Sequence, residues 1–377
     1  MSPASESGSV AEVFDRHVRV GGGGMAFAVC RDGELICSLA GGHTCRGGAA
    51  APEAWGTETM AVLFSGTKGL AAAVVGMLVD GGLIDVEAPV ARYWPEFAAA
   101  GKDEVPVCQL LNHTVGLPYV DPDPVGDGEQ YDNRLMATRL AAQRPLWSPG
   151  TKVAYHAITY GYLLSELVWR VTGADVGELI AERIAGPHGL DIHLGLPAEL
   201  EDRIAPIHQA AGYRVSTFLD DDPERRAIVD RMYAGLLLSG DSPFNTREYH
   251  AAQQAAGGGI ATAESMARFY ALLLEDGAIL SRQTREMFTR TWSEGIDVIN
   301  DRPLRFGLGF ELADPIGTYG PVEAAFGHSG AGGGLHGAWP EHGIAFSFLT
   351  NEMQSEDVDT RVKELLAALY AEVTGGK

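Results

Sequence analysis

The sequence predicts an α+β fold in which strands from both ends of the chain form one antiparallel sheet. Two observations support this fold class. Strand-like segments lie near the N-terminus, in residues 25–41, and return near the C-terminus, in residues 306–351. Residues 86–255 between them are mostly helical in pattern, with loops. Strands and helices that are segregated along the chain favour a sheet flanked by helices, here with a mostly helical insert.

The first strands form a predicted hairpin. The segment "FAVCRDGELICSL" (27–39) alternates in polarity and turns at Asp32-Gly33, a dipeptide typical of tight hairpin turns. In that register Cys30 and Cys37 share a face but lie diagonally, roughly 7–8 Å apart, which is long for a disulfide. We therefore expect all the cysteines, which also lack zinc-type spacing, to be free thiols: Cys30, Cys37, Cys45 and Cys108.

Three segments have apolar residues at helical spacing. The helix predicted at 66–80 ends near Gly81-Gly82. The other two are "YGYLLSELVWRVTG" (160–173) and "ESMARFYALLLEDG" (264–277). Residues 120–149 and 218–226 have weaker patterns, and we expect them to be loops, of the kind that often face a substrate.

The C-terminal part returns to strands, separated by Gly and Pro. The predicted strands are "FGLGFEL" (306–312), "LHGAWP" (335–340) and "GIAFSFLTN" (343–351). A last helix is expected over roughly 356–373, with Val358 on its apolar face. These strands complete the sheet that the N-terminal hairpin begins.

Composition excludes some classes of function. The chain has 377 residues, 46% of them hydrophobic and 21% charged, which is typical of a soluble globular protein. A formal charge of −22 disfavours nucleic acid and anionic membranes as partners, because phosphates are repelled. The first residues show no secretory signal, so a cytoplasmic location is expected. Neither a cofactor nor an oligomeric state is predicted.

The residues Ser65-Gly66-Thr67-Lys68 open an otherwise apolar helix. Positions i and i+3 share a helical face, so Lys68 points to the same place as Ser65. In a dry site the pKa of Lys68 falls, and its neutral amine can take the proton of the serine hydroxyl. The motif alone also fits an ordinary alternative, an N-capping serine followed by a solvated lysine.

Four further segments follow in a set order: "LLNHTVGLP" (110–118), "PLWSPGTKVAYHAITYGYLL" (145–164), "AAGGGIATAESMARFYALL" (255–273) and "FGHSGAGGG" (326–334). With them the chain, from about residue 20 to 370, resembles the serine β-lactamase superfamily. It is most similar to the class C branch, the family VIII carboxylesterases and the D-alanyl-D-alanine carboxypeptidase relatives. The resemblance implies a β-lactamase/transpeptidase-like fold.

The resemblance also implies two domains with the active site at their interface. One is a discontinuous sheet domain of residues 10–65 and 256–377, and the other is the mostly helical domain of residues 66–255. Ser65 then matches the acylated nucleophile and Lys68 its base partner. Tyr155 matches the tyrosine of the family's Tyr-x-Asn motif, which exchanges protons with the serine and the leaving group. We expect a nearby cation, Lys68, to lower the pKa of this phenol.

The remaining site residues also follow from the resemblance. His328-Ser329-Gly330 match the Lys-Thr-Gly strand, which lines the site opposite Ser65 and binds substrate. The oxyanion hole is then formed by the backbone N–H groups of Ser65 and Ala331. Ala157 departs from the family pattern, because it replaces the asparagine that holds the lysine and contacts the substrate amide. This change disfavours β-lactam hydrolysis more than acylation.

The predicted function is that of a serine hydrolase with a covalent acyl-enzyme at Ser65, most simply an esterase on small-molecule esters. Alternatives are an acyltransferase of secondary metabolism, an amidase or weak β-lactamase, and a non-catalytic ligand-binding relative. "GHSGAG" (327–332) also resembles the nucleophile elbow of α/β-hydrolases, but only 48 residues follow Ser329, too few for their later acid and histidine. A metal enzyme is disfavoured, since "GHSGAGGGLHG" lacks a matching carboxylate cluster.

Overall fold

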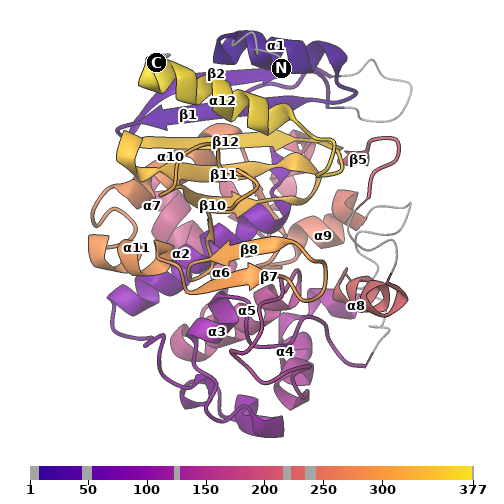
Figure 1. Ribbon diagram of the computed structural model, residues 1–377, viewed down its shortest axis with the longest axis vertical. Helices are drawn as coiled ribbons and strands as arrows, with labels where there is room; N and C mark the ends of the chain where they lie inside the picture. Colours follow the sequence, from indigo (N-terminus) through magenta and orange to yellow (C-terminus); the bar gives the residue numbers. More distant parts are fainter. Residues whose placement is uncertain (1–7, 45–52, 123–127, 215–221, 234–242, 376–377) are drawn as a thin grey trace.

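The computed structural model describes residues 8–44, 53–122, 128–214, 222–233 and 243–375. Its main sheet is antiparallel throughout and joins the two ends of the chain, with β1 hydrogen-bonded to β12 (Figure 1). This confirms the predicted α+β class. In sheet order the strands are β2 (Glu34–Gly41), β1 (Met25–Arg31), β12 (Ile344–Thr350), β11 (Leu335–Trp339), β10 (Phe326–Ser329), β9 (Glu311–Leu312), β8 (Pro303–Phe306) and β7 (Ser293–Ile296).

Helices cover both faces of this sheet. Helices α1 (Val10–Val20) and α12 (Arg361–Thr374) pack on one face, and α10 (Ala263–Leu274) and α2 (Thr67–Asp80) lie on the other (Figure 1). Alternate residues of β1 enter the two resulting cores. Since α2 begins just after Ser65, the sheet holds the first turn of this helix in a fixed place.

The insert is mostly helical, as predicted. Its helices are α3 (Cys108–Leu111), α4 (Asn133–Ala142), α5 (Thr159–Thr172), α6 (Val176–Ile180), α7 (Gly186–His188), α8 (Pro223–Tyr233) and α9 (Arg247–Ala251). Helix α11 (Arg282–Thr289) lies between α10 and β7. The domain boundaries at residues 65 and 255 stay a prediction.

Two small sheets tie the insert to the rest of the chain. In one, β6 (Gly259–Ala261) pairs with both β3 (Ala61–Val62) and β4 (Ile192–Leu194). In the other, β5 (His208–Gln209) pairs in parallel with β13 (Glu352–Met353). Strand β3 leads directly towards Ser65, so these pairings fix the approach to the predicted nucleophile.

Several boundaries differ from prediction. The expected loop 120–149 contains α4, which begins where the Asp132 carboxylate accepts the N–H groups of Arg134 and Leu135. The expected strand 306–312 is divided between β8 and β9 by a turn at Gly309, whose φ of +84° favours glycine. The last helix begins at 361, and Val358 is 64% exposed rather than on a buried face.

The predicted placement of the cysteines is wrong. A bulge between Val29 and Cys30 puts Cys37 opposite Val29, so Cys30 and Cys37 lie on opposite faces of the hairpin. Cys30, Cys37 and Cys108 are free thiols, as expected, and Cys45 lies outside the described residues. Among the helices described here, none combines the length and apolarity needed to cross a bilayer.

Candidate active site

Ser65 lies in a tight turn between β3 and α2. This turn is the 3-10 segment η1 (Phe64–Gly66), in which Phe64 has an unusual φ of +47° for a residue with a side chain. A Cβ atom at Gly66 would lie 2.5 Å from Cδ2 of His336, so only glycine fits there. The Thr67 hydroxyl donates to the Phe64 carbonyl, at 2.6 Å. The turn is therefore fixed on both sides of the Ser65 hydroxyl.

Lys68 is completely buried one helical turn after Ser65. Its Nζ lies 3.0 Å from Ser65 Oγ, 2.8 Å from the Ala157 carbonyl oxygen and 2.8 Å from the Ala256 carbonyl oxygen. A neutral amine has two N–H donors and one lone pair. Because carbonyls only accept, both donors are used by Ala157 and Ala256, and the lone pair then faces the Ser65 hydroxyl.

The electrostatics of Lys68 agree with this geometry. Burial lowers the pKa of its ammonium well below the ordinary value, and the nearby carboxylate of Glu311 opposes that effect only in part. The Ala157 carbonyl holds Lys68 at the position where the resemblance leads us to expect an asparagine side chain.

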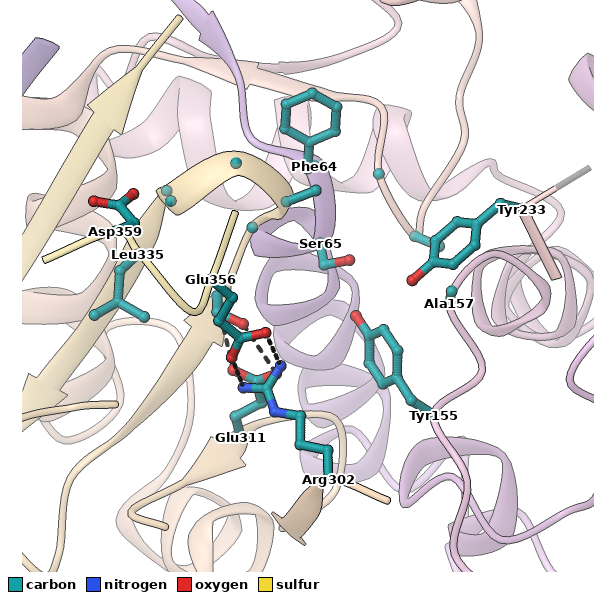
Figure 2. A pocket seen from close by; sticks show the side chains of 18 of the residues that line it. Phe64, Ser65, Tyr155, Ala157, Tyr233, Arg302, Glu311, Leu335, Glu356 and Asp359 are labelled. Atoms are coloured by element: carbon teal, nitrogen blue, oxygen red, sulfur yellow. Dashed lines mark hydrogen bonds and ion pairs between the residues drawn. The ribbon is translucent and has the colours of Figure 1, made fainter. Parts of the chain in front are cut away.

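Tyr155 lies across from Ser65, with its hydroxyl turned towards the serine (Figure 2). Lys68 Nζ is 4.9 Å from the centre of its ring. Its backbone N–H donates to the buried carboxylate of Asp297, at 2.8 Å, which the sequence did not indicate. Burial raises the pKa of the phenol, Glu311 raises it further, and a hydrogen bond with the Ser65 side chain opposes both. The expected lowering of the Tyr155 pKa is therefore wrong, and the phenol is a proton donor at rest.

His113, from the segment "LLNHTVGLP", supports Tyr155 from behind. Its ring centre lies 4.9 Å from that of Tyr155 and 4.4 Å from that of Phe306. Its Nδ1 accepts the backbone N–H of His156, the residue after Tyr155, at 3.1 Å. Burial lowers the pKa of His113, so the ring is neutral. The segment was recognised in the sequence, but no role was predicted for this histidine.

The two predicted oxyanion donors come from two short 3-10 turns. Ser65 lies in η1 and Ala331 begins η8 (Ala331–Gly333), and N–H groups in the first turn of a helix have no partner within it. Within the described ranges neither N–H meets another acceptor. A Cβ atom at Gly330 would lie 2.4 Å from the Leu63 carbonyl oxygen, so the backbones of the two turns pack directly on each other.

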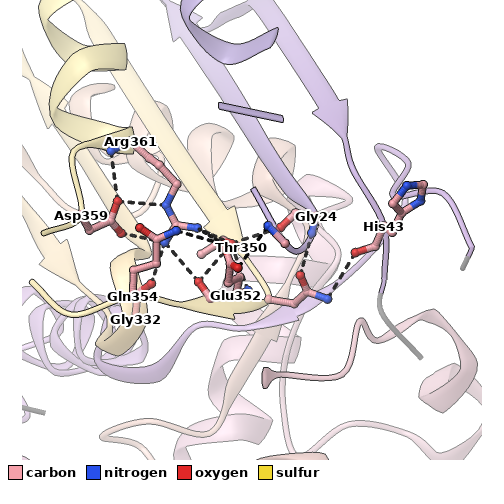
Figure 3. A network of polar contacts seen from close by, with 10 residues as sticks. Gly24, His43, Gly332, Thr350, Glu352, Gln354, Asp359 and Arg361 are labelled. Carbon is pink, nitrogen blue, oxygen red and sulfur yellow. Dashed lines mark hydrogen bonds and ion pairs between the residues drawn. The ribbon is translucent and has the colours of Figure 1, made fainter. Parts of the chain in front are cut away.

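A buried cluster around Arg361 holds the second turn (Figure 3). Arg361 Nη2 donates to the Gly332 carbonyl at 3.0 Å and to the Glu352 carbonyl at 3.1 Å. The Asp359 carboxylate accepts from the same guanidinium, from Nη2 at 2.7 Å and from Nε at 2.9 Å. Both side chains are almost fully buried. This ion pair fixes the carbonyl group of Gly332, the residue after Ala331.

The residues of the predicted Lys-Thr-Gly match divide into two groups. Ser329 and Gly330 line the cavity beside Ser65, as does Ala157. His328 is fully buried, its Nδ1 lies 2.8 Å from the Ser329 carbonyl oxygen, and it is absent from the wall formed by the described residues. Burial lowers the pKa of His328 to about 4. It is thus neutral and behind the wall, not in direct reach of a substrate.

Glu311 is a buried carboxylate that the sequence did not reveal. It accepts the Ser329 N–H at 2.9 Å, the Ser329 hydroxyl at 3.1 Å and the Tyr319 hydroxyl at 2.6 Å. Burial alone would raise the pKa of this carboxyl, but His328, Arg302 and these hydrogen bonds bring it to about 2. Glu311 is therefore ionised at neutral pH. It lies on β9, next to strand β10, which carries Ser329.

These groups surround a cavity of about 200 Å³. One wall is largely aromatic and aliphatic, and segment 208–250 contributes much of it: Tyr213, Val229, Met232, Tyr233, Phe244 and Tyr249. The opposite end is polar and includes Arg302, Glu311, Ser329 and Glu356 (Figure 2). The described residues of 120–149 and 218–226 do not line the cavity, contrary to the expectation for substrate-facing loops.

A family model described as Beta-lactamase matches residues 11–371. The chain belongs to the beta-lactamase family. Esterase/beta-lactamase LipL of Mycobacterium tuberculosis is 35% identical to it over an alignment of 354 residues, which covers 90% of this chain and 79% of LipL. Two solved structures are each 32% identical. One is a penicillin-binding protein homolog from Caulobacter crescentus, with a TM-score of 0.86 and 98% of each chain covered. The other is a family VIII carboxylesterase, with a TM-score of 0.87 and 97% covered.

Membership of the beta-lactamase family confirms the predicted fold and places the chain among serine hydrolases that include esterases. The α/β-hydrolase alternative is excluded, because the fold is a different one and because Ser329 ends a strand of an antiparallel sheet. In that strand the Ser329 hydroxyl donates to Glu311 and meets no imidazole base among the described side chains.

Proposed function

We propose that this protein is an esterase that hydrolyses small-molecule esters through a covalent acyl-enzyme at Ser65. The observation that carries the proposal is the environment of Lys68 Nζ, which has two carbonyl acceptors and the Ser65 hydroxyl around it and no exposure to solvent. That environment favours a neutral amine whose lone pair meets the serine proton. A hydroxyl beside such a base is an activated nucleophile.

In the proposed acylation, the proton of Ser65 passes to Lys68 Nζ while Oγ attacks the ester carbonyl carbon. The negative charge on the carbonyl oxygen is stabilised by the N–H groups of Ser65 and Ala331. The bond to the alcohol then breaks, and the alkoxide takes the proton of the Tyr155 hydroxyl. The Lys68 ammonium returns a proton to Tyr155, so the net change is transfer of the serine proton to the alcohol.

In the proposed deacylation, water attacks the acyl carbon and its proton passes to Lys68 Nζ, which is again neutral. Ser65 Oγ leaves with the proton of the Tyr155 hydroxyl, the Lys68 ammonium returns a proton to Tyr155, and the free acid is released. A raised phenol pKa suits Tyr155 to its part in both steps, because the phenol stays protonated until a stronger base, the leaving alkoxide, needs its proton.

Two features support esters over β-lactams as substrates. Ala157 offers no side-chain amide to pair with a substrate amide, and a buried group left unpaired costs on the order of 1–3 kcal/mol. His328 stands where relatives have a cationic lysine, and it is neutral and behind the cavity wall. Esters need fewer polar partners, and alcohols leave more readily than amines.

The test is to acylate the protein with short-chain p-nitrophenyl esters and with a fluorophosphonate, and to map the modified residue by peptide mass. We expect a single adduct on Ser65, steady ester turnover, and very slow hydrolysis of a chromogenic cephalosporin. Ser65→Ala should lose both the adduct and the turnover. Ser329→Ala is the matched control, because Ser329 also lines the cavity but lacks a base.

Three results would contradict the proposal. They are an adduct on Ser329, unchanged ester turnover in Ser65→Ala, and cephalosporin hydrolysis that rivals that of the esters.

A second experiment tests whether water or an added alcohol accepts the acyl group. The mass of the intact acylated protein is followed with and without added alcohols. Decay in water alone supports an esterase, whereas an adduct that only an added nucleophile removes would replace the esterase by an acyltransferase.

A further inference from the structure

An ion pair occupies the polar end of the cavity. Arg302, in the turn between β7 and β8, donates from Nη1 to Glu356 Oε2 at 3.0 Å and from Nη2 to Glu356 Oε1 at 2.9 Å. This is the two-point geometry in which a guanidinium binds a carboxylate most strongly. Both residues line the same cavity as Ser65 and Tyr155 (Figure 2).

The two partners differ in how they are held. The side chain of Arg302 is 19% exposed, whereas that of Glu356 is 52% exposed. Glu356 lies between β13 and α12 and reaches the guanidinium from the solvent side. A carboxylate from a substrate would therefore compete with Glu356 for a guanidinium that is already in place.

The surrounding charges make that competition unfavourable for an anion. Glu311 is ionised beside Arg302 and keeps its own donors. Asp359 also lines the cavity, but its charge is balanced by Arg361. The inner polar end thus has two carboxylates, Glu311 and Glu356, for one guanidinium.

The other cations do not reverse this balance. Lys68 is behind the wall and has no exposed surface. Arg214 and Lys363 contribute to the lining, but both residues are exposed, where solvent and salt screen their charge. An anionic substrate group at this end would therefore add a third negative charge and leave Glu356 without its bidentate partner.

On the basis of the proposed esterase function, we infer that Glu356 is a specificity-determining residue. By occupying Arg302, it makes the site select esters that are uncharged at this end of the cavity and disfavour esters that carry a carboxylate there. Removal of the Glu356 charge makes a partly buried guanidinium available to the substrate and so converts the same site into one that accepts anionic esters.

The test uses two pairs of esters that are matched in shape and differ in charge. In the first pair the acyl chain varies: mono-p-nitrophenyl glutarate against its neutral isostere, p-nitrophenyl isoheptanoate. In the second pair the alcohol varies: phenyl butyrates with a meta carboxylate or a meta carboxamide. The measured quantity is the ratio of kcat/KM for the anionic ester to that for the neutral ester, after subtraction of spontaneous hydrolysis.

In the pair whose charge falls at the polar end, we expect the wild-type ratio to be roughly tenfold below unity, and Glu356→Gln to raise it roughly tenfold, as for one hydrogen-bonded charge pair. Arg302→Met in the Glu356→Gln background should abolish the gain. Asp357→Asn is the matched control, since Asp357 is exposed, adjacent in sequence and outside the cavity lining. It removes the same charge and should leave the ratio within about twofold, because exposed charges are screened.

The inference is overturned if neither pair discriminates in the wild-type protein, or if Glu356→Gln changes the ratio no more than Asp357→Asn does. Failure of the proposed function is recognised separately, because the neutral esters would then not be hydrolysed at Ser65. Thermal unfolding of each variant identifies any that does not fold, and Glu356→Gln, at a half-exposed position, decides the outcome without Arg302→Met.

Discussion

Two lysines in the described part of the chain are completely buried, Lys68 and Lys102, and they differ in one of their three polar contacts. Lys102 Nζ donates to the carbonyl oxygens of Ala99 at 2.7 Å, Ala141 at 2.9 Å and Gln143 at 2.5 Å. Lys68 Nζ contacts two carbonyl oxygens, and its third contact is the Ser65 hydroxyl. Three carbonyls match the three N–H donors of an ammonium. Two carbonyls and a hydroxyl match a neutral amine with one lone pair.

Burial alone does not make a lysine a base. Burial is the main cause that lowers the pKa of both, well below the ordinary value for Lys68 and to about 8 for Lys102. At neutral pH each of the three protons of the Lys102 ammonium is donated to a carbonyl oxygen, so Lys102 remains a structural cation. Among the three polar contacts of Lys68, only the Ser65 hydroxyl can donate a proton to its amine, and Ser65 is the proposed nucleophile.

Replacement of Lys68 should have the greatest consequence, because acylation of Ser65 then loses its general base. Lys68→Met removes the general base, and Lys68→Arg replaces it with a group that cannot become neutral. Each should slow fluorophosphonate inactivation of Ser65 by about a thousandfold, within the range for loss of a general base. Stopped-assay inactivation rates measure this, with circular dichroism as the check of folding. Near-normal inactivation in either variant would remove Lys68 from the mechanism.

Lys102 should respond in stability instead. Lys102→Met removes the donor of three carbonyl groups. The turn at Ala99 is then no longer linked through this side chain to the end of α4. We expect the free energy of unfolding to fall by about 3 kcal/mol, since each unpaired buried group costs about 1–3 kcal/mol and some will find other partners. Urea titration measures this, while turnover per folded molecule should be retained.

Lys152→Met is the matched control for Lys102→Met, because Lys152 is exposed. Its effect on the free energy of unfolding should stay within about 0.5 kcal/mol. If Lys102→Met were as stable as this control, three carbonyl contacts would not be what keeps Lys102 in place. If it unfolded normally but lost catalysis, the distinction between the two lysines would be wrong.

In the sequence, only the spacing to a neighbouring serine distinguishes Lys68 from Lys102. Ser65 and Lys68 are three residues apart at the start of an apolar helix, so their contact follows from helical geometry. Lys102 has no such neighbour, and its partners Ala141 and Gln143 are about forty residues away, so its role could not be read from its surroundings in the chain. Contacts between residues that are close in the sequence could therefore be predicted, whereas contacts between residues far apart in the sequence could not.

The wrong predictions have the same origin. The pKa of Tyr155 was expected to fall because Lys68 was the only partner in view, but burial and Glu311, far along the chain, raise it. His328 was expected to face substrate, yet the fold places its ring behind the wall. The Cys30–Cys37 placement failed because a single bulge reverses the face of every later residue. Charge and burial at a site are properties of the assembled fold.

The rate of acylation should depend on pH through the protonation of Lys68. The neutral form of Lys68 is the reactive one, so the rate should rise with pH through the pKa of this residue. Because burial lowers that pKa well below the ordinary lysine value, the midpoint should lie far to the acidic side of an exposed lysine. Inactivation rates against pH measure it. A midpoint at the ordinary lysine value would mean that the amine is solvated and the site is not dry.

The weakest effect should come from a charged residue that shifts the pKa of each lysine. Arg144 lowers the pKa of Lys102, whereas Glu311 raises that of Lys68. Glu311→Gln removes this negative charge, can keep an oxygen acceptor for the Ser329 N–H, and should move the midpoint of acylation to lower pH. Glu311 also raises the pKa of Tyr155 and of His328, so its loss shifts all three groups in the same direction. Glu323→Gln, an exposed change of the same charge, should leave the midpoint in place. Equal midpoints in both variants would show that the pKa of Lys68 is governed by its desolvation and its two carbonyl contacts alone, and a shift to higher pH would contradict the sign of the Glu311 effect.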